Sequence, residues 1–204
     1  MKIITLEIAG FESALKGMRN PMNSWDKNDS YNLDNFDVLI GKNDLDLAQR
    51  LIKAGAEHCK FLRQIQVWAD FDMPRYWWSE FDTYKIGTSA NSCSTMHKLL
   101  NNKEPITRHL FVGSMEDFDV LDIVIDRLEE LRKEYQETKN DYLLVRAKRI
   151  LPEGFLQLRT VNLSYQTIRN IYHQRKNHRL KEEWIDTFCE WIKTLPYSEE
   201  FIIN

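Results

Sequence analysis

The densest group of side chains that could bind an anion lies in the segment RNIYHQRKNHRLK, residues 169–181. Five lysines and arginines and two histidines occur there, in a chain whose formal net charge is −3. Guanidinium groups bind phosphate through paired, charge-assisted hydrogen bonds, so the segment favours an anionic ligand. The alternative is a solvated helix face near a helix C-terminus, where cations are favourable without any ligand.

A second candidate is the segment TSANSCST, residues 88–95, which is rich in hydroxyl groups and is expected to be a loop. It could offer neutral hydrogen-bond donors to a phosphate or a base, or it could be an ordinary polar surface loop. Nearby His97 could titrate near neutral pH. Cys93 could act as a nucleophile, although nothing in the sequence indicates a lowered thiol pKa.

Aromatic residues precede this segment. They could stack on a planar ligand ring, but aromatic side chains at this density more often form the core. The residues concerned are Trp68, Tyr76, Trp77 and Trp78.

Composition excludes several classes of protein. The 204 residues are 43% hydrophobic and 29% charged, which is typical of one globular domain. A pI near 6.0 provides no basic field for nucleic acid. The three cysteines form no CxxC pair and favour a reducing cytoplasm. No apolar run is long enough to span a membrane, and the sequence has no GxGxxG, P-loop, HExxH or other metal-ligand spacing.

The elements that must position these side chains follow from periodicity. Residues 2–8 and 63–72 alternate as strands, with Pro74 ending the second and a helix beginning at 75–80. Residues 20–35 read as a long polar loop, and long loops are often functional or mobile. Residues 44–54 predict a helix that ends at Gly55.

Four further helices are expected at 115–136, 141–151, 165–176 and 180–194. Ser114 and Asp117 resemble a capping box for the first of these. The fold class is therefore α+β: one helix-rich domain over residues 1–204 with a small sheet, built mostly from the N-terminal third.

Two pairs of segments resemble motifs of the flavin-dependent thymidylate synthases, both in their order along the chain and in their spacing. The first pair is residues 51–78, ending in MPRYWW, followed by NSCSTMHKL at 91–99. The second pair is RAKRILPEGFLQLRTVN at 146–162, followed by RNIYHQRKNH at 169–178. The resemblance implies a mostly antiparallel sheet, a pyrimidine deoxynucleotide such as dUMP as the small-molecule ligand, FAD as cofactor and a homotetramer with sites at subunit interfaces.

The resemblance also implies roles for individual residues. Arg75 and Trp77 fit the start of the motif helix, and Arg146 and the following Leu–Pro pair fit a later segment. The residues implied to bind nucleotide are Asn91, Ser94, Arg159 and Arg175. Those implied to contact the cofactor are Asn170 and His178. No residue is assigned as catalytic.

The sequence departs from the family where its chemistry is concentrated. An Arg-His-Arg triplet is replaced by Ser79, Glu80 and Phe81, and a final Arg-Tyr pair by Met96 and His97. Each lost arginine removes charge-assisted hydrogen bonds of roughly 1.5–3 kcal/mol. Glu80 would add repulsion near a phosphate.

Three hypotheses remain open. The chain could be a divergent enzyme of nucleotide metabolism that uses FAD. It could be a module that binds or sequesters a nucleotide or nucleotide-derived signal without turnover, which would suit a bacteriophage or mobile element. It could also be a helical interaction protein whose basic segment is only a surface. No membrane or nucleic-acid partner is expected under any of them.

Overall fold

The computed structural model describes residues 1–33 and 38–204. The last two residues of the polar loop expected at 20–35 therefore lie outside the described residues. The contacts divide the chain into two compact units. The first unit contains residues 71–83 and 91–159 with Met1, and the second contains 2–70, 84–90 and 160–204.

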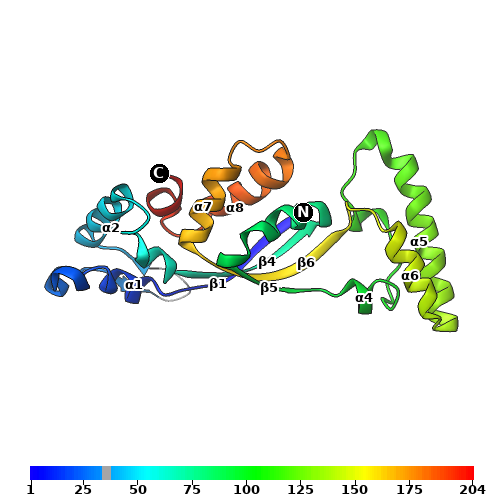
Figure 1. Ribbon diagram of the computed structural model, residues 1–204, viewed down its shortest axis with the longest axis horizontal. Helices are drawn as coiled ribbons and strands as arrows, with labels where there is room; N and C mark the ends of the chain where they lie inside the picture. Colours follow the sequence, from blue (N-terminus) through cyan, green and yellow to red (C-terminus); the bar gives the residue numbers. More distant parts are fainter. Residues whose placement is uncertain (34–37) are drawn as a thin grey trace. The chain divides into compact units, whose positions relative to one another are not determined.

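A four-stranded sheet has the strand order β1-β4-β6-β5 (Figure 1). Its strands are β1 (Lys2–Ala9), β4 (Gln66–Pro74), β5 (Thr88–Ser92) and β6 (Leu156–Ser164). In the first unit the Arg75 N–H donates to the carbonyl of Phe155 at 3.1 Å. In the second unit the Tyr165 N–H donates to the carbonyl of Ile65 at 3.0 Å. Because residue numbers rise on one strand as they fall on the other, β4 and β6 are antiparallel.

The small antiparallel sheet in a helix-rich fold is as expected, but two details of the prediction were wrong. Residues 88–92 form an edge strand, β5, where a loop was expected. A sheet drawn mostly from the N-terminal third was also wrong, since β5 and β6 come from later in the chain. The sequence LQLRTVNLS of β6 puts Arg159 and Thr160 among its apolar residues, which obscures the strand pattern. A separate ribbon pairs β2 (Tyr31–Asn32) with β3 (Val38–Leu39).

The alternation predicted for β4 is confirmed. Val67, Ala69, Phe71 and Met73 are fully buried, while the residues between them are half-buried. Pro74 ends the strand, and α3 (Arg75–Phe81) begins at the next residue. This arrangement places Asp70 and Asp72 on the less covered face of the strand.

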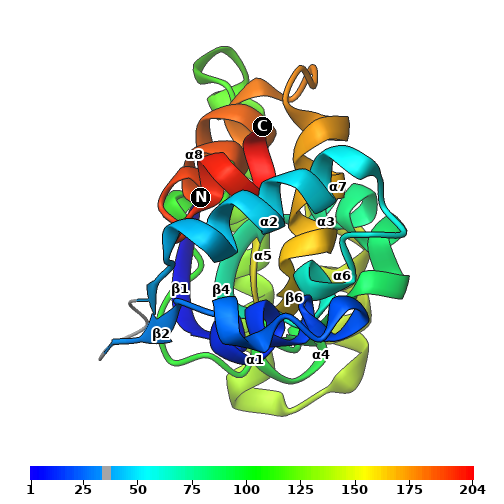
Figure 2. The ribbon, with the colours of Figure 1, turned by 90° about the vertical axis from the view of Figure 1, so that its left-hand side faces the viewer.

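In the second unit, helices cover one face of the strands. The helices are α1 (Phe11–Gly17), α2 (Lys42–Ala54), α7 (Tyr165–Arg175), η7 (Lys181–Cys189), α8 (Glu190–Lys193) and η8 (Glu199–Ile203). Figures 1 and 2 show α2, α7 and α8 grouped beside β1 and β4. The Trp191 indole N–H donates to the Thr5 hydroxyl at 3.0 Å, which joins α8 to β1. The apolar stripe predicted at 180–194 is buried core, with Trp184 and Phe188 fully covered.

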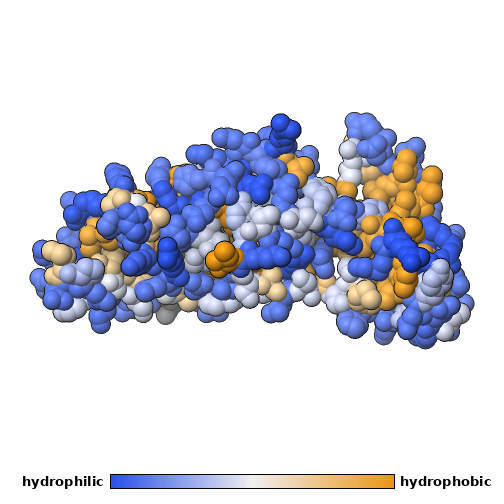
Figure 3. All heavy atoms as spheres, in the orientation of Figure 1, coloured by the Kyte–Doolittle hydropathy of each residue, from blue (hydrophilic) through white to orange (hydrophobic). Residues whose placement is uncertain are grey.

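In the first unit, α5 (Phe118–Thr138) and α6 (Asp141–Ile150) pack side by side (Figure 1). Leu128, Leu131, Leu143 and Ala147 lie at the centre of their shared core. The expected capping box was wrong, because a short 3-10 turn, η6 (Met115–Asp117), precedes α5 and no side chain caps either segment. Figure 3 shows hydrophobic residues gathered over these helices. On α5, Val120 and Ile123 are exposed.

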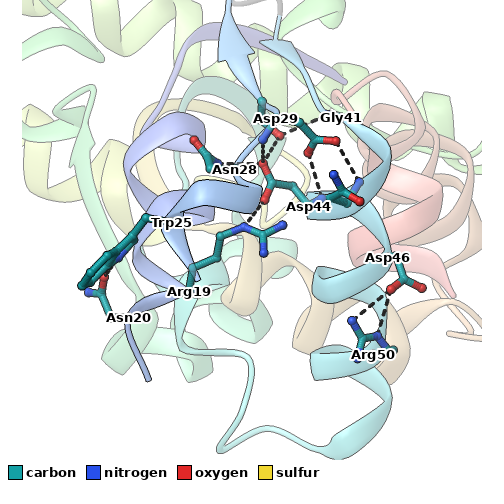
Figure 4. A network of polar contacts seen from close by, with 11 residues as sticks. Arg19, Asn20, Trp25, Asn28, Asp29, Gly41, Asp44, Asp46 and Arg50 are labelled. Atoms are coloured by element: carbon teal, nitrogen blue, oxygen red, sulfur yellow. Dashed lines mark hydrogen bonds and ion pairs between the residues drawn. The ribbon is translucent and has the colours of Figure 1, made fainter. Parts of the chain in front are cut away.

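A buried network fixes the described part of the polar segment in the second unit (Figure 4). The fully buried Asp44 carboxylate accepts hydrogen bonds from the Arg19 Nε at 2.6 Å, the Asn28 amide at 2.7 Å and the Ser30 hydroxyl at 2.6 Å. It also accepts from the Asp29 N–H at 3.0 Å. These bonds tie the segment to the first turn of α2. In the part of the chain that the structure describes, no helix is long and apolar enough to cross a membrane.

Candidate functional site

A polar cavity of about 380 Å³ lies within the first unit. Three cationic side chains and two acidic ones line it, which leaves one net positive charge. The charged lining residues are Arg75, Lys148, Arg159, Asp82 and Glu153, and the remaining ones are Trp78, Ser79, Thr95 and Gln157. An excess of cations around one cavity suits an anionic ligand.

Arg159 is held by three different contacts. Its Nη1 lies 2.9 Å from Asp82 Oδ1, and its guanidinium lies 4.1 Å from the centre of the Trp78 ring. The Trp78 indole is fixed in turn by a 2.9 Å bond to the Gln157 carbonyl. The buried Nε of Arg159 has no hydrogen-bond partner among the described residues. The contacts with Asp82 and Trp78 therefore pre-position the guanidinium at the cavity.

Arg75 and Lys148 complete the cationic lining. Arg75 Nη2 pairs with Glu153 Oε1 at 3.2 Å, and Lys148 Nζ donates to the Thr95 hydroxyl at 2.6 Å. Burial lowers the pKa of Lys148, and the positive charge of Arg75 lowers it further. A bound anion would raise the pKa of Lys148 again, because it stabilises the charged ammonium. Two guanidinium forks and one ammonium are donors that match a phosphate.

Lys148 was missed by the sequence analysis, which assigned Arg146 to this segment. Lys148 precedes Leu151 by three residues on α6 and shares the cavity with Arg159. Within the described chain, Arg146 does not line this cavity. The helical period offered a signal, because Lys148 follows the buried Leu144 by one turn.

An apolar cavity of about 180 Å³ adjoins the polar one, since Thr95 and Gln157 line both. Its walls include Leu99, Ile106 and Phe155. Ser94, Cys93 and Asp72 also line it, the last from β4. The first unit thus contains a cationic compartment beside an apolar one.

The structure places the expected nucleotide-binding residues of the first unit unevenly. Arg159 lines the polar cavity and Ser94 the apolar one. The Ser94 hydroxyl also accepts from the His97 N–H at 3.3 Å and caps α4 (Thr95–Lys98). Asn91 is exposed on β5, and Met96 and His97 are exposed on α4.

The three residues that replace the triplet, Ser79, Glu80 and Phe81, lie on α3 in three different environments. Phe81 is buried and stacks on Trp77 with ring centres 4.9 Å apart. The Ser79 hydroxyl donates to the Arg75 carbonyl at 3.3 Å and lies at the polar cavity. Glu80 is half-buried on the same helix. The core interpretation of Trp77 and Trp78 is confirmed, since they are 0% and 1% exposed.

The remaining expected residues lie in the second unit, on or just after α7. Arg175 Nε donates to the Tyr84 hydroxyl at 2.8 Å, and its guanidinium lies 4.7 Å from the Trp184 ring centre. Asn170 is exposed and accepts from Gln166 at 3.1 Å. His178 Nδ1 accepts from the Leu180 N–H at 3.2 Å. Within the basic segment at residues 169–181, the Arg175 side chain therefore packs against aromatic rings.

Metal chemistry receives no support from side-chain clustering. In residues 1–33 and 38–204, no group of three or more His, Cys, Asp or Glu side chains could hold a metal ion.

Comparisons with known proteins agree on the fold. A flavin-dependent thymidylate synthase from Helicobacter pylori, solved with FAD and dUMP, is similar with a TM-score of 0.74 and 19% identity. The match covers 98% of both chains. A second structure from that organism, also with FAD and dUMP, gives a TM-score of 0.73 and 18% identity over 99% of this chain and 97% of that one.

A third similar structure is the UMP/dUMP methylase PolB from Streptomyces cacaoi, bound with 5-Br dUMP. Its TM-score is 0.63 at 16% identity, over 98% of this chain and 93% of that one. No family model and no curated protein sequence matches the chain. The chain has the fold of the flavin-dependent thymidylate synthases, as its sequence motifs indicated.

Proposed function

We propose that this chain is a nucleotide-binding protein whose polar cavity holds the ligand's phosphate. The observation that carries the proposal is the convergence of Arg75, Lys148 and Arg159 on one cavity. Arg159 is the principal phosphate ligand in this proposal, because its guanidinium is fixed on Trp78 and lines the cavity. Asp82 and Glu153 hold the Arg159 and Arg75 side chains in place through ion pairs. A bound phosphate would compete with these carboxylates for the same guanidinium groups.

The three similar structures support a nucleotide as the ligand. Two were solved with dUMP and FAD and the third with 5-Br dUMP. A nucleoside monophosphate has one compact anion and one planar ring, which suits a cationic cavity beside an apolar one. We therefore propose a nucleoside monophosphate as the simplest ligand.

The residues present do not fit FAD at the replaced triplet. The resemblance assigns cationic flavin contacts to these positions, but Phe81 is packed in the core. Glu80 adds negative charge, and the Ser79 hydroxyl is bonded to the Arg75 carbonyl. We propose that the chain binds nucleotide without flavin, as a binding or sequestering module.

The spectrum of the purified protein tests this proposal against the flavoenzyme hypothesis. We expect no absorbance band between 300 and 550 nm after incubation with FAD and desalting, with or without dUMP. The same sample is expected to bind a nucleoside monophosphate in a thermal-shift assay, because ligand that binds only the native state raises the melting temperature. A flavin band that survives desalting would contradict the flavin-free proposal and call for a turnover assay.

We also keep a homotetramer as a proposal. Val120 and Ile123 are 60% and 70% exposed on α5, and an apolar surface of this kind is consistent with a subunit interface. The stripe at 180–194 no longer supports an interface, since Trp184 and Phe188 are core residues.

A further inference from the structure

The apolar cavity contains a carboxyl group that no described residue uses. Asp72 lines the cavity from β4, together with Leu99, Ile106 and Phe155. The charged residues Lys98 and Glu104 line it as well. In the described part of the chain, its carboxyl has no hydrogen bond and no ion pair. Carboxylates in apolar surroundings are unfavourable unless hydrogen-bond donors approach them.

The electrostatics of Asp72 agree with this geometry. Burial raises the pKa of the Asp72 carboxyl, and the positive amino group of Met1 opposes the effect more weakly. A ligand that supplies N–H groups would stabilise the ionised form. A charged group held in an apolar cavity with a shifted pKa is a common feature of binding sites.

The position of Asp72 relative to the polar cavity limits the ligand. The two cavities share Thr95 and Gln157 and therefore adjoin, and we take one molecule to span them. If its phosphate lies among the cations, its ring enters the apolar cavity and meets the carboxyl of Asp72. The ring must then present N–H donors at its edge.

We propose that the apolar cavity is a base-recognition site in which Asp72 selects a guanine-type edge, that is, a ring N–H beside an exocyclic amino group. This inference rests on the proposed nucleotide binding and adds the identity of the base. An ionised carboxylate has two acceptor oxygens and can accept two parallel N–H bonds. Guanine offers two adjacent donors, N1–H and the 2-amino group.

Other bases present a poorer edge to a carboxylate. Uracil has one ring N–H flanked by two carbonyl oxygens, which would repel the carboxylate oxygens. Adenine and cytosine place a ring acceptor beside their amino group. Hypoxanthine keeps N1–H but lacks the 2-amino group, so IMP is the matched control ligand for GMP.

Cys93 provides a reporter of occupancy. It lines the apolar cavity and is exposed, whereas Cys59 and Cys189 are buried. The rate at which iodoacetamide alkylates Cys93 can therefore be followed in the full-length chain by mass spectrometry. A bound base is expected to slow this reaction.

The experiment compares GMP, IMP and dUMP as protectants of Cys93 in the wild type, Asp72→Asn and Asp72→Leu. We expect GMP to protect at concentrations at least about tenfold lower than IMP or dUMP, since one lost hydrogen bond to a charged group costs about that factor. In Asp72→Leu, the concentrations of GMP and IMP that are needed to protect Cys93 should become equal. Asp72→Asn keeps the shape of the side chain, and should also lose the preference because it presents one acceptor oxygen.

The possible failures are distinguishable. Equal protection by GMP and IMP in the wild type, or a preference retained in both Asp72 variants, would overturn base recognition by Asp72. Nucleotide binding that still depends on Arg159 would then leave the proposed function standing. If none of the three nucleotides binds or protects, both proposals fall.

Discussion

Replacing Asp44 by alanine is expected to lower the free energy of unfolding by about 3–5 kcal/mol. The Arg19 and Asp44 side chains are only 4% and 0% exposed. Removing the carboxylate leaves the Arg19 guanidinium buried without its counter-charge, and one of its terminal nitrogens already has no partner. Asn28 and Ser30 lose their acceptor as well.

The control is Asp46→Ala on the same helix. Asp46 pairs with Arg50 at 3.0 Å, but the two side chains are 66% and 67% exposed (Figure 4). Exposed pairs of this kind contribute about 0–1 kcal/mol. Urea unfolding followed by circular dichroism measures both variants. Equal losses of stability at Asp44 and Asp46 would show that the network does not anchor the polar segment.

Replacing Arg159 by glutamine is expected to weaken the binding of a nucleoside monophosphate by about ten- to a hundredfold, because a hydrogen bond to a charged group contributes roughly 1.5–3 kcal/mol. Lys148→Met should have an effect of the same size. The two losses need not add, since both groups meet the same phosphate. Titration of the intrinsic tryptophan fluorescence is a suitable readout, because Trp78 lies beneath Arg159.

Arg146→Gln is the matched control for Lys148→Met, since both residues lie on α6. The sequence resemblance pointed to Arg146, whereas the structure places Lys148 at the cavity. We expect Arg146→Gln to leave the affinity unchanged within a factor of two or so, as for surface substitutions away from a site. A loss at Arg146 with none at Lys148 would favour the sequence assignment over the structural one.

Periodicity predicted the elements that are buried on one face. Val67, Ala69 and Phe71 repeat at every second residue, and the alternation indicated the β4 strand. The α2 and α7 helices were predicted nearly to their ends, with Gly55 stopping the first. In such elements local pattern and tertiary burial agree.

Edges and helix starts were less predictable. The strand β5 consists of small polar residues, and four of its five residues are exposed, so no hydrophobic alternation marks it. Hydrogen bonding to β6 defines β5 as a strand, because its own side chains show no strand pattern. The start of α5 was missed for a similar reason, because backbone hydrogen bonding in a 3-10 turn replaces the expected side-chain cap.

The candidate site was predictable only in part. Arg159 and Ser94 were expected and lie at the two cavities. Lys148 and Asp72 were not, because each appears in the sequence as an ordinary surface charge on an amphipathic element. Their role depends on partners distant in sequence, such as Thr95 at 53 positions from Lys148. Only the folded chain brings such distant side chains to one cavity, so the sequence alone does not predict it.

The central claim is that a phosphate is held in the polar cavity of the first unit. Calorimetric titration of the wild-type chain with GMP and dUMP, and with guanosine and deoxyuridine, tests it most directly. We predict that each monophosphate binds at least about tenfold more tightly than its nucleoside, since the nucleoside lacks the charge-assisted bonds. Equal affinities for monophosphate and nucleoside, or no binding of either monophosphate, would contradict the claim.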